Sequence, residues 1–153
     1  MEATPQFGAR LAGLTYDDRP AAFGLAERDG RLALVRVRKS AQLEWLDLPG
    51  GGIESGEAAA EALVREFGEE TGLIVAEPQP FAAADQYFIK TDGSAHNNRQ
   101  TFFAVRICGE EQGLKVEVDH ELEWLPPEVA LTCLRHDSHA WAVLAWLRRR
   151  GGD

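Results

Sequence analysis

A proline and three glycines placed directly before a well-marked helix restrict the fold of this chain more than any other feature. The apolar stretch 45–48 is typical of a short strand. The segment Pro49-Gly50-Gly51-Gly52 ends that strand, because proline lacks a ladder donor and glycine permits unusual backbone angles. A helix is expected over Glu57–Thr71, with Ser55 as its N-cap and Gly72 at its end. Strand, shaped loop and helix therefore follow one another without a linker.

One face of this expected helix is strongly acidic. Glu66, Glu69 and Glu70 stand at positions i, i+3 and i+4, which share a face. Leu63 and Phe67 lie on a neighbouring, partly opposite face that is suited to packing on a sheet. Like charges so spaced cost an isolated helix roughly 0.2–0.5 kcal/mol per pair. The pattern alone fits either a cation site or a solvated acidic surface.

The rest of the chain alternates apolar segments with turn residues. Further strands are expected at residues 22–27, 31–38, 74–75, 81–84, 86–90, 101–107 and 121–125. Pro126-Pro127 should break the last of them, and His136–Arg150 has the spacing of a closing helix with a basic last turn. Strands mixed with two or three helices predict an α/β fold. At 153 residues, a single domain covering 1–153 is expected.

Composition narrows the functional classes. The content of 44% hydrophobic and 27% charged residues is that of an ordinary globular chain. A net charge of −9 disfavours a nucleic-acid polymer as ligand, whereas a small anion remains compatible if a bound cation reverses the local field. No apolar stretch is long enough for a membrane span, and the start does not resemble a signal peptide. Cys108 and Cys133, far apart, suggest free core-type thiols and a cytoplasmic location.

The glycine loop and the acidic helix together form a recognisable motif. Residues 51–73 read Gly51-x5-Glu57-x7-Arg65-Glu66-Phe67-x-Glu69-Glu70-x-Gly72-Leu73. This segment resembles the Nudix box, the signature of the MutT-like pyrophosphohydrolases, at every fixed position. The resemblance implies an α/β/α sandwich with a mixed β-sheet between helices. It also implies metal-dependent hydrolysis of the pyrophosphate bond in a nucleoside diphosphate derivative.

The same resemblance implies roles for individual residues. It assigns metal ligation to Gly50, through its carbonyl, and to Glu66, Glu69 and Glu70. Carboxylate and carbonyl oxygens suit Mg²⁺, with Mn²⁺ as an alternative. Glu57 is expected to support the site from the loop, and Arg65 to orient the glutamates by pairing with them. A simple surface pair between Arg65 and Glu69 is the competing interpretation.

The residue that accepts the proton from the attacking water varies within the family. The catalytic candidates are Glu66 or Glu69 in the box, and Glu121 or Glu123 downstream, of which we prefer Glu121. Strand alternation offers a different interpretation, with both downstream glutamates on a solvated face and Leu122 buried. The histidines at 120, 136 and 139 are expected to be surface or hydrogen-bonded structural residues.

The substrate is less constrained than the reaction. Tyr87 and Arg99 stand in stretches rich in aromatic and amide groups, and we expect them to contact a base and a phosphate, although both stretches also resemble ordinary strands. A nucleoside triphosphate is the first candidate, and a nucleotide sugar or ADP-ribose the alternative. A non-catalytic nucleotide-sensing domain and isoprenoid diphosphate isomerisation stay open as other uses of the fold. A homodimer is compatible with the sequence.

Overall fold

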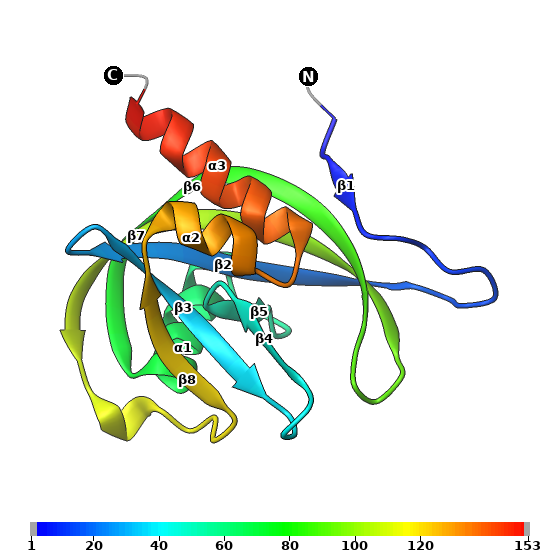
Figure 1. Ribbon diagram of the computed structural model, residues 1–153, viewed down its shortest axis with the longest axis horizontal. Coiled ribbons are helices and arrows are strands. Elements are labelled where there is room, and N and C mark those ends of the chain that lie inside the picture. Colours follow the sequence, from blue (N-terminus) through cyan, green and yellow to red (C-terminus); the bar gives the residue numbers. More distant parts are fainter. Residues whose placement is uncertain (1–2, 152–153) are drawn as a thin grey trace.

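The computed structural model describes residues 3–151, which form a curled sheet with helices on both sides (Figure 1). The strands are β1 (Gln6–Phe7), β2 (Asp17–Arg28), β3 (Arg31–Arg38), β4 (Glu44–Asp47), β5 (Gly50–Gly52), β6 (Leu73–Ile89), β7 (Ala95–Glu110) and β8 (His120–Leu125). The helices are α1 (Ala59–Thr71), α2 (Pro127–Cys133) and α3 (Asp137–Gly151), with a 3-10 turn η1 at Gln112–Leu114.

The sheet is mixed, as expected. Its main strand order is β1-β6-β7-β2-β3-β4, while β5 pairs with β2 and β8 pairs with β3. The pairs β1–β6 and β2–β7 are parallel and the others antiparallel. The β2–β3 hairpin closes through Asp29 and Gly30, both with positive φ (52° and 75°), the backbone typical of a tight two-residue turn. The prediction of a mixed sheet between helices is confirmed.

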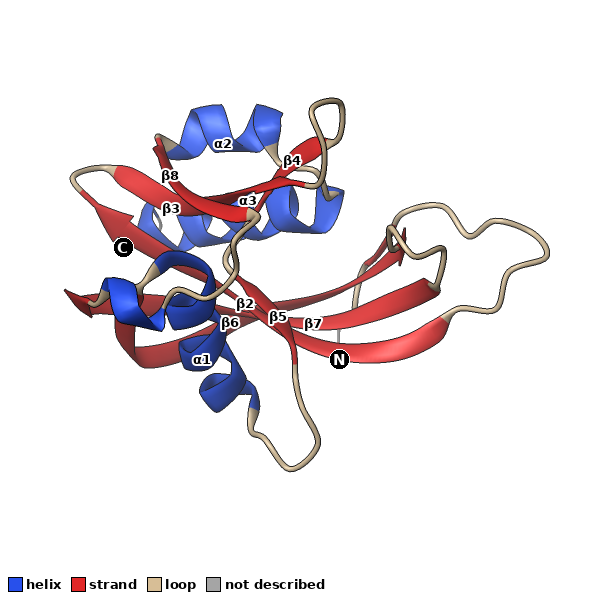
Figure 2. Cartoon of the chain, turned by 90° about the horizontal axis from the view of Figure 1, so that it is seen from below, coloured by secondary structure: helices blue, strands red, loops and turns tan. Residues whose placement is uncertain are grey.

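Two apolar clusters form the core, one on each side of β2. Figure 2 shows α1 and α3 on opposite sides of this strand. On one side, α1 buries Leu63 and Phe67 completely. Gly24 of β2 makes room for them, because a Cβ there would lie 2.8 Å from the Phe67 ring. On the other side, α3 contributes Val143 and Trp146. Burial of one such large side chain stabilises a fold by roughly 1.5–3 kcal/mol. Burial of Leu63 and Phe67 therefore fixes α1 on the sheet, and its acidic residues do not take part in this apolar contact.

Several boundaries differ from those expected. Helix α1 begins at Ala59, two residues after the expected start, and Ser55 is not its N-cap. Ala58 occupies that position, and its N–H donates to Glu61 Oε1 at 3.3 Å. A glutamate reaching back from the first turn thus replaces the serine cap. The helix ends as expected, at Gly72 in the left-handed region.

Other differences concern the second half of the chain. Strand β6 is continuous across three expected pieces, because register shifts near Ala76 and Pro80 absorb the irregular sequence. Helix α2 was not expected. Pro127 occupies its first turn, where backbone N–H groups have no partner within the helix, so the N–H that proline lacks is not missed. Both cysteines, 108 and 133, are exposed, so their interpretation as core-type thiols was wrong. Within residues 3–151, no helix is long and apolar enough to cross a bilayer.

Candidate active site

The glycine loop brings the backbone against the acidic face of α1. Gly50 has φ of 145°, and a Cβ there would lie 2.1 Å from the Ala22 carbonyl oxygen of β2. A Cβ on Gly51 would lie 2.9 Å from the carboxyl carbon of Glu66. Gly50 therefore requires glycine, because its backbone angle and the Ala22 carbonyl both exclude a side chain, whereas a side chain at residue 51 would have to displace the Glu66 carboxylate. The glycine loop thus lies close to the carboxylates, with the Gly50 amide on Glu70 and the Gly52 carbonyl on Arg65.

Arg65 connects most of the acidic residues of the box. Its guanidinium donates twice to Glu57, at 2.8 and 3.0 Å, and lies 2.9 Å from Glu66 and 3.2 Å from Glu69. It also donates to the Gly52 carbonyl at 3.2 Å. The bonds from Arg65 and from the Glu54 N–H lower the pKa of Glu57 to about 2. Arg65 thus binds more carboxylates than a surface i,i+4 pair would, and its planar fork suits this arrangement.

Glu70 is the most enclosed of the box glutamates, with 7% of its surface exposed. One of its oxygens accepts the Gly50 N–H at 2.9 Å, and the other lies 3.2 Å from His120 Nε2. Burial raises the pKa of Glu70 to about 7, against the opposing effect of these two donors. His120 in turn lies 2.6 Å from Asp119 through Nδ1. Glu70 therefore joins the glycine loop to the start of β8.

Glu66 and Glu69 stand beside Glu70 with less enclosure. Their side chains are 16% and 32% exposed. Burial raises the pKa of Glu66, Arg65 opposes that rise, and the charges of Glu69 and Glu117 add to it. Negative charge exceeds positive charge here, since one arginine serves several carboxylates. Such an excess is stable only if a cation or a proton compensates it.

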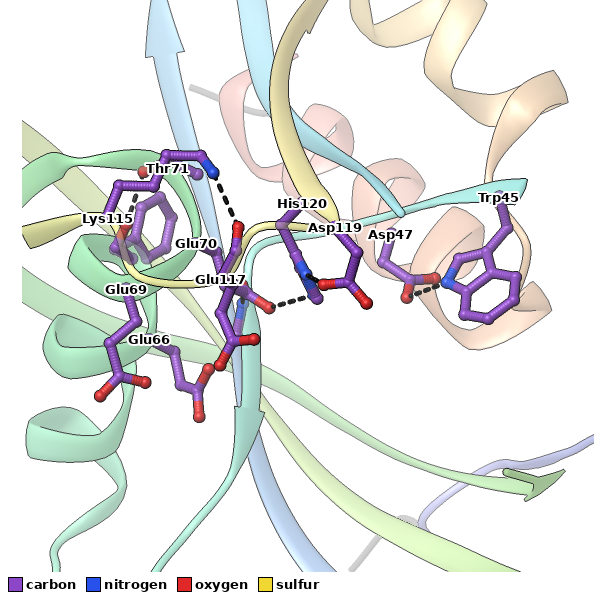
Figure 3. A network of polar contacts seen from close by, with 12 residues as sticks. Trp45, Asp47, Glu66, Glu69, Glu70, Thr71, Lys115, Glu117, Asp119 and His120 are labelled. Carbon is purple, nitrogen blue, oxygen red and sulfur yellow. Dashed lines mark hydrogen bonds and ion pairs between the residues drawn. The ribbon is translucent and has the colours of Figure 1, made fainter. Parts of the chain in front are cut away.

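A carboxylate outside the box joins this group. The loop after η1 packs along α1, where the backbone amides of Val116 and Glu117 both donate to the Glu69 carbonyl, at 2.9 and 3.1 Å. Figure 3 shows the Glu117 side chain directed towards Glu66 and Glu70. Ligand atoms of Glu117, Asp119 and His120 lie within 4.8 Å of one another, a grouping that could hold a metal ion. Glu117 was not among the site residues predicted from the sequence.

The downstream candidate Glu121 lies elsewhere. In β8, Leu122 and Trp124 face the α1 core cluster together with His120, so Glu121 and Glu123 point to the opposite face. Glu121 is 66% exposed and lies 3.5 Å from Arg38 of β3. The structure therefore places Glu117 and His120, and not Glu121, beside the box glutamates. This arrangement is the strand alternation that stood as the alternative to Glu121 as the base.

The two expected substrate-binding residues are held by other contacts. The Tyr87 ring packs against Tyr16, with centroids 4.9 Å apart. Arg99 pairs with Asp18 and Asp85 on neighbouring strands. Across residues 3–151, no hydrogen bond or ion pair joins either side chain to a box glutamate. Arg19 of β2 lies closer to the box than these two residues: a Cβ on Gly52 would be 2.8 Å from its guanidinium. Burial lowers the pKa of Arg19, and the charge of Glu66 opposes that shift.

This geometry agrees with comparisons to known proteins. The model of the NUDIX domain matches residues 16–147, which is most of the chain. The chain belongs to the Nudix family. The NUDIX hydrolase from Nitrosomonas europaea shares its fold, with a TM-score of 0.71 at 16% identity, covering 85% of this chain and 88% of that one.

Several curated Nudix relatives are similar in sequence. An RNA pyrophosphohydrolase of Sphingopyxis alaskensis is 32% identical over 112 residues, 63% of this chain and 67% of that protein. An ADP-ribose pyrophosphatase of Methanocaldococcus jannaschii is 43% identical over 54 residues, 35% of this chain and 32% of that protein. Nucleoside triphosphatase NudI of Escherichia coli is 29% identical over 114 residues, covering 68% and 79%. Family and relatives support a pyrophosphohydrolase enzyme.

The donor set of this Nudix site fits a hard divalent cation. Its charged groups are carboxylate oxygens on α1 and on the loop before β8, with backbone groups of the glycine loop beside them. Mg²⁺ and Mn²⁺ prefer such oxygen ligands, whereas zinc sites usually include cysteine or several histidines. Burial is the main cause of the raised pKa values of Glu66 and Glu70, and the neighbouring carboxylates add to it.

Proposed function

We propose that this protein hydrolyses the pyrophosphate bond of a nucleoside diphosphate derivative, with a nucleoside triphosphate as the first candidate and Mg²⁺ or Mn²⁺ as cofactor. One observation carries the proposal: several carboxylates from two separate segments converge beside Gly50 with one arginine among them. Glu66, Glu69 and Glu70 would hold the cation together with the Gly50 carbonyl. The bound cation would neutralise phosphate charge and lower the pKa of water.

The protein side chains have distinct proposed tasks. Arg65 and Glu57 hold Glu66 and Glu69 in place, since the guanidinium bonds to all three carboxylates. Glu66, Glu69 or Glu117 accepts the proton of the attacking water, and Glu117 replaces Glu121 as the candidate outside the box. His120 fixes the second oxygen of Glu70. Glu70 and its neighbours thereby keep a single arrangement while substrate enters, which is what preorganised electrostatic catalysis requires.

The names of the relatives suggest specific alternatives for the substrate. The ADP-ribose pyrophosphatase of M. jannaschii suggests ADP-ribose as an alternative, and the RNA pyrophosphohydrolase of S. alaskensis suggests RNA. Small nucleotides fit the net charge of −9 better than a polymer does. A nucleotide sugar and a non-catalytic sensor also stay among the alternatives. A cytoplasmic location and a homodimer stay predictions from the sequence.

Product analysis tests this proposal directly. Purified protein is incubated with nucleoside triphosphates, ADP-ribose, nucleotide sugars and a 5′-triphosphate oligoribonucleotide, each with Mg²⁺, with Mn²⁺ and with chelator. We expect metal-dependent release of nucleoside monophosphate and pyrophosphate from at least one triphosphate. A folded protein inactive on all of them, yet binding one tightly, would favour the sensor instead. Preference for ADP-ribose would keep the reaction and change the substrate.

A further inference from the structure

A cavity of about 540 Å³ opens between two turns of the curled sheet. Its walls come from the β3–β4 turn, strand β4, the β6–β7 turn and Arg135. The lining residues are Lys39, Leu43, Trp45, Phe88, Ile89, Lys90, Thr91, Asp92 and Arg135. A volume of roughly 300–1,000 Å³ with an apolar lining and a few polar groups is typical of small-molecule sites. None of the glutamates assigned to metal binding or catalysis lines this cavity.

Trp45 presents a flat aromatic wall whose position is fixed. Its indole N–H donates to Asp47 Oδ2 at 3.0 Å. The guanidinium of Arg135 stacks over the ring, 4.1 Å from its centroid, and also donates twice to Asp47, at 3.1 and 2.7 Å. An aromatic face that is already held loses little entropy when a planar ligand stacks on it. The Trp45 ring is therefore held in place at the cavity wall, with the Arg135 guanidinium over one of its faces.

The cavity adjoins the carboxylate site through a short chain of contacts. Lys39, in the cavity wall, lies 2.6 Å from Asp119, and Asp119 lies 2.6 Å from His120. His120 reaches Glu70 at 3.2 Å. Figure 3 shows Trp45 and Asp47 at one end of this line of side chains and Glu66 and Glu69 at the other. Direct side-chain contacts therefore link the cavity wall to Glu70.

The polar groups of the cavity are mainly donors. The lining contains one carboxylate, Asp92, and three cations: Lys39, Lys90 and Arg135. That carboxylate already accepts bonds from the backbone and hydroxyl of Ser94. Among residues 3–151, the Lys90 ammonium has no hydrogen-bond or ion-pair partner, in contrast to Lys39 and Arg135. A ligand edge made of acceptors matches this set better than an edge that carries an amino donor.

We infer that this cavity binds the base of the nucleotide substrate, stacked near Trp45, and favours guanine over adenine through Lys90. Guanine presents two adjacent acceptors, O6 and N7, whereas adenine presents one acceptor and one amino donor on the same edge. The inference rests on the proposed function for the placement of the phosphates. Its binding test is independent of turnover.

Calorimetry with three Mg²⁺-bound probes tests this assignment. The probes are the non-hydrolysable β,γ-imido analogues of GTP and ATP, and inorganic triphosphate, which has no base. Trp45→Leu should weaken binding of the GTP analogue about tenfold, the scale for loss of one base–aromatic stack, and leave inorganic triphosphate unchanged. Trp45→Phe should keep most of the affinity, which separates stacking from local misfolding. Lys90→Met should reduce the preference for the GTP analogue over the ATP analogue.

Control variants and outcomes separate this inference from the proposed function. Arg148→Met removes one exposed positive charge at the far end of α3 and should change none of the affinities. Equal affinity of wild type and Trp45→Leu for the GTP analogue would overturn the base site. A stronger wild-type affinity for the ATP analogue would overturn the guanine preference. Absence of hydrolysis for every nucleotide would reject the proposed activity, while the same calorimetry would still decide the base site.

Discussion

The two sides of the sheet both enclose polar side chains, but they treat them differently. Under α3 the groups are neutral and matched: His139 Nδ1 accepts the Leu48 N–H at 3.2 Å, and Nε2 lies 3.1 Å from Oε1 of the Gln100 side chain. Gln100 then donates to Ser138 at 3.0 Å. On the α1 side, the groups are carboxylates that outnumber their cations. Matched polar groups make a rigid interior, whereas unmatched charge requires a ligand.

The neutral polar groups under α3 also help to position the glycine loop on the α1 side. Leu48 lies just before the Pro49-Gly50 segment, so the bond from its N–H to His139 fixes the entry to the glycine loop. Because Nδ1 accepts that bond, Nε2 carries the proton and donates to Gln100. Burial keeps the pKa of His139 well below its usual range, so the ring stays neutral and this arrangement persists. One side of the sheet should therefore govern stability, and the other catalysis.

The largest effect expected from this difference is on the α1 side. Glu69→Gln should lower kcat at least about 100-fold, the scale on which single preorganised groups act. Unfolding in urea should show unchanged or slightly higher stability, because one like charge is removed. Glu128→Gln, on the exposed face of α2, is the matched control and should retain full activity. Wild-type kcat in Glu69→Gln would remove the box glutamates from the mechanism.

A smaller but decisive effect separates the two candidate glutamates outside the box. Glu117→Gln should lower kcat more than Glu121→Gln, since Glu117 lies with Glu66 while Glu121 pairs with Arg38 on the other face of β8. Steady-state kinetics at saturating metal measures both. The reverse ranking would restore Glu121 as the base and require β8 to shift its register during the reaction.

These glutamates also illustrate what the sequence could and could not predict. The helix with its acidic face, its end at Gly72 and the mixed sheet followed from local patterns and the box. The position of Glu117 depends on how the loop after η1 packs along α1, a contact between segments almost fifty residues apart. Local patterns carry no such information. The inward face of β8 could be predicted, because strand alternation places His120 on the same face as the apolar Leu122 and Trp124, which pack against the α1 cluster.

The stability of the protein should respond mainly to the α3 side. His139→Phe leaves the Leu48 N–H and the Gln100 side-chain oxygen Oε1 without partners, which should cost about 1–3 kcal/mol for each unsatisfied group. Urea unfolding measures this loss. Below the unfolding transition, kcat should fall far less than in Glu69→Gln. A large loss of kcat at unchanged stability would show that the two sides are not separable in this way.

The smallest expected effect is in the pH dependence of the metal-free protein, where the two sides oppose each other. Burial raises the pKa of Glu70 from 4.5 to about 7, so between these values the folded chain holds a proton that the unfolded chain releases. Stability from Glu70 therefore falls as pH rises through this window. Burial lowers the pKa of His136 to about 3, so the unfolded chain binds the extra proton below pH 6.5. Stability from His136 therefore rises with pH up to about that value.

Glu70→Gln should separate these opposing contributions. The variant lacks the Glu70 contribution that falls with pH. The difference in Tm between the metal-free variant and wild type should therefore grow in favour of the variant as pH rises from about 5 to 7. A change of 1 kcal/mol corresponds to about 2–4 °C for a chain of this length, which calorimetry resolves. Glu57, with its pKa lowered to about 2, contributes a constant amount across this range. A difference in Tm that stays constant with pH would mean that Glu70 ionises normally and that His120 and the Gly50 amide already compensate its charge.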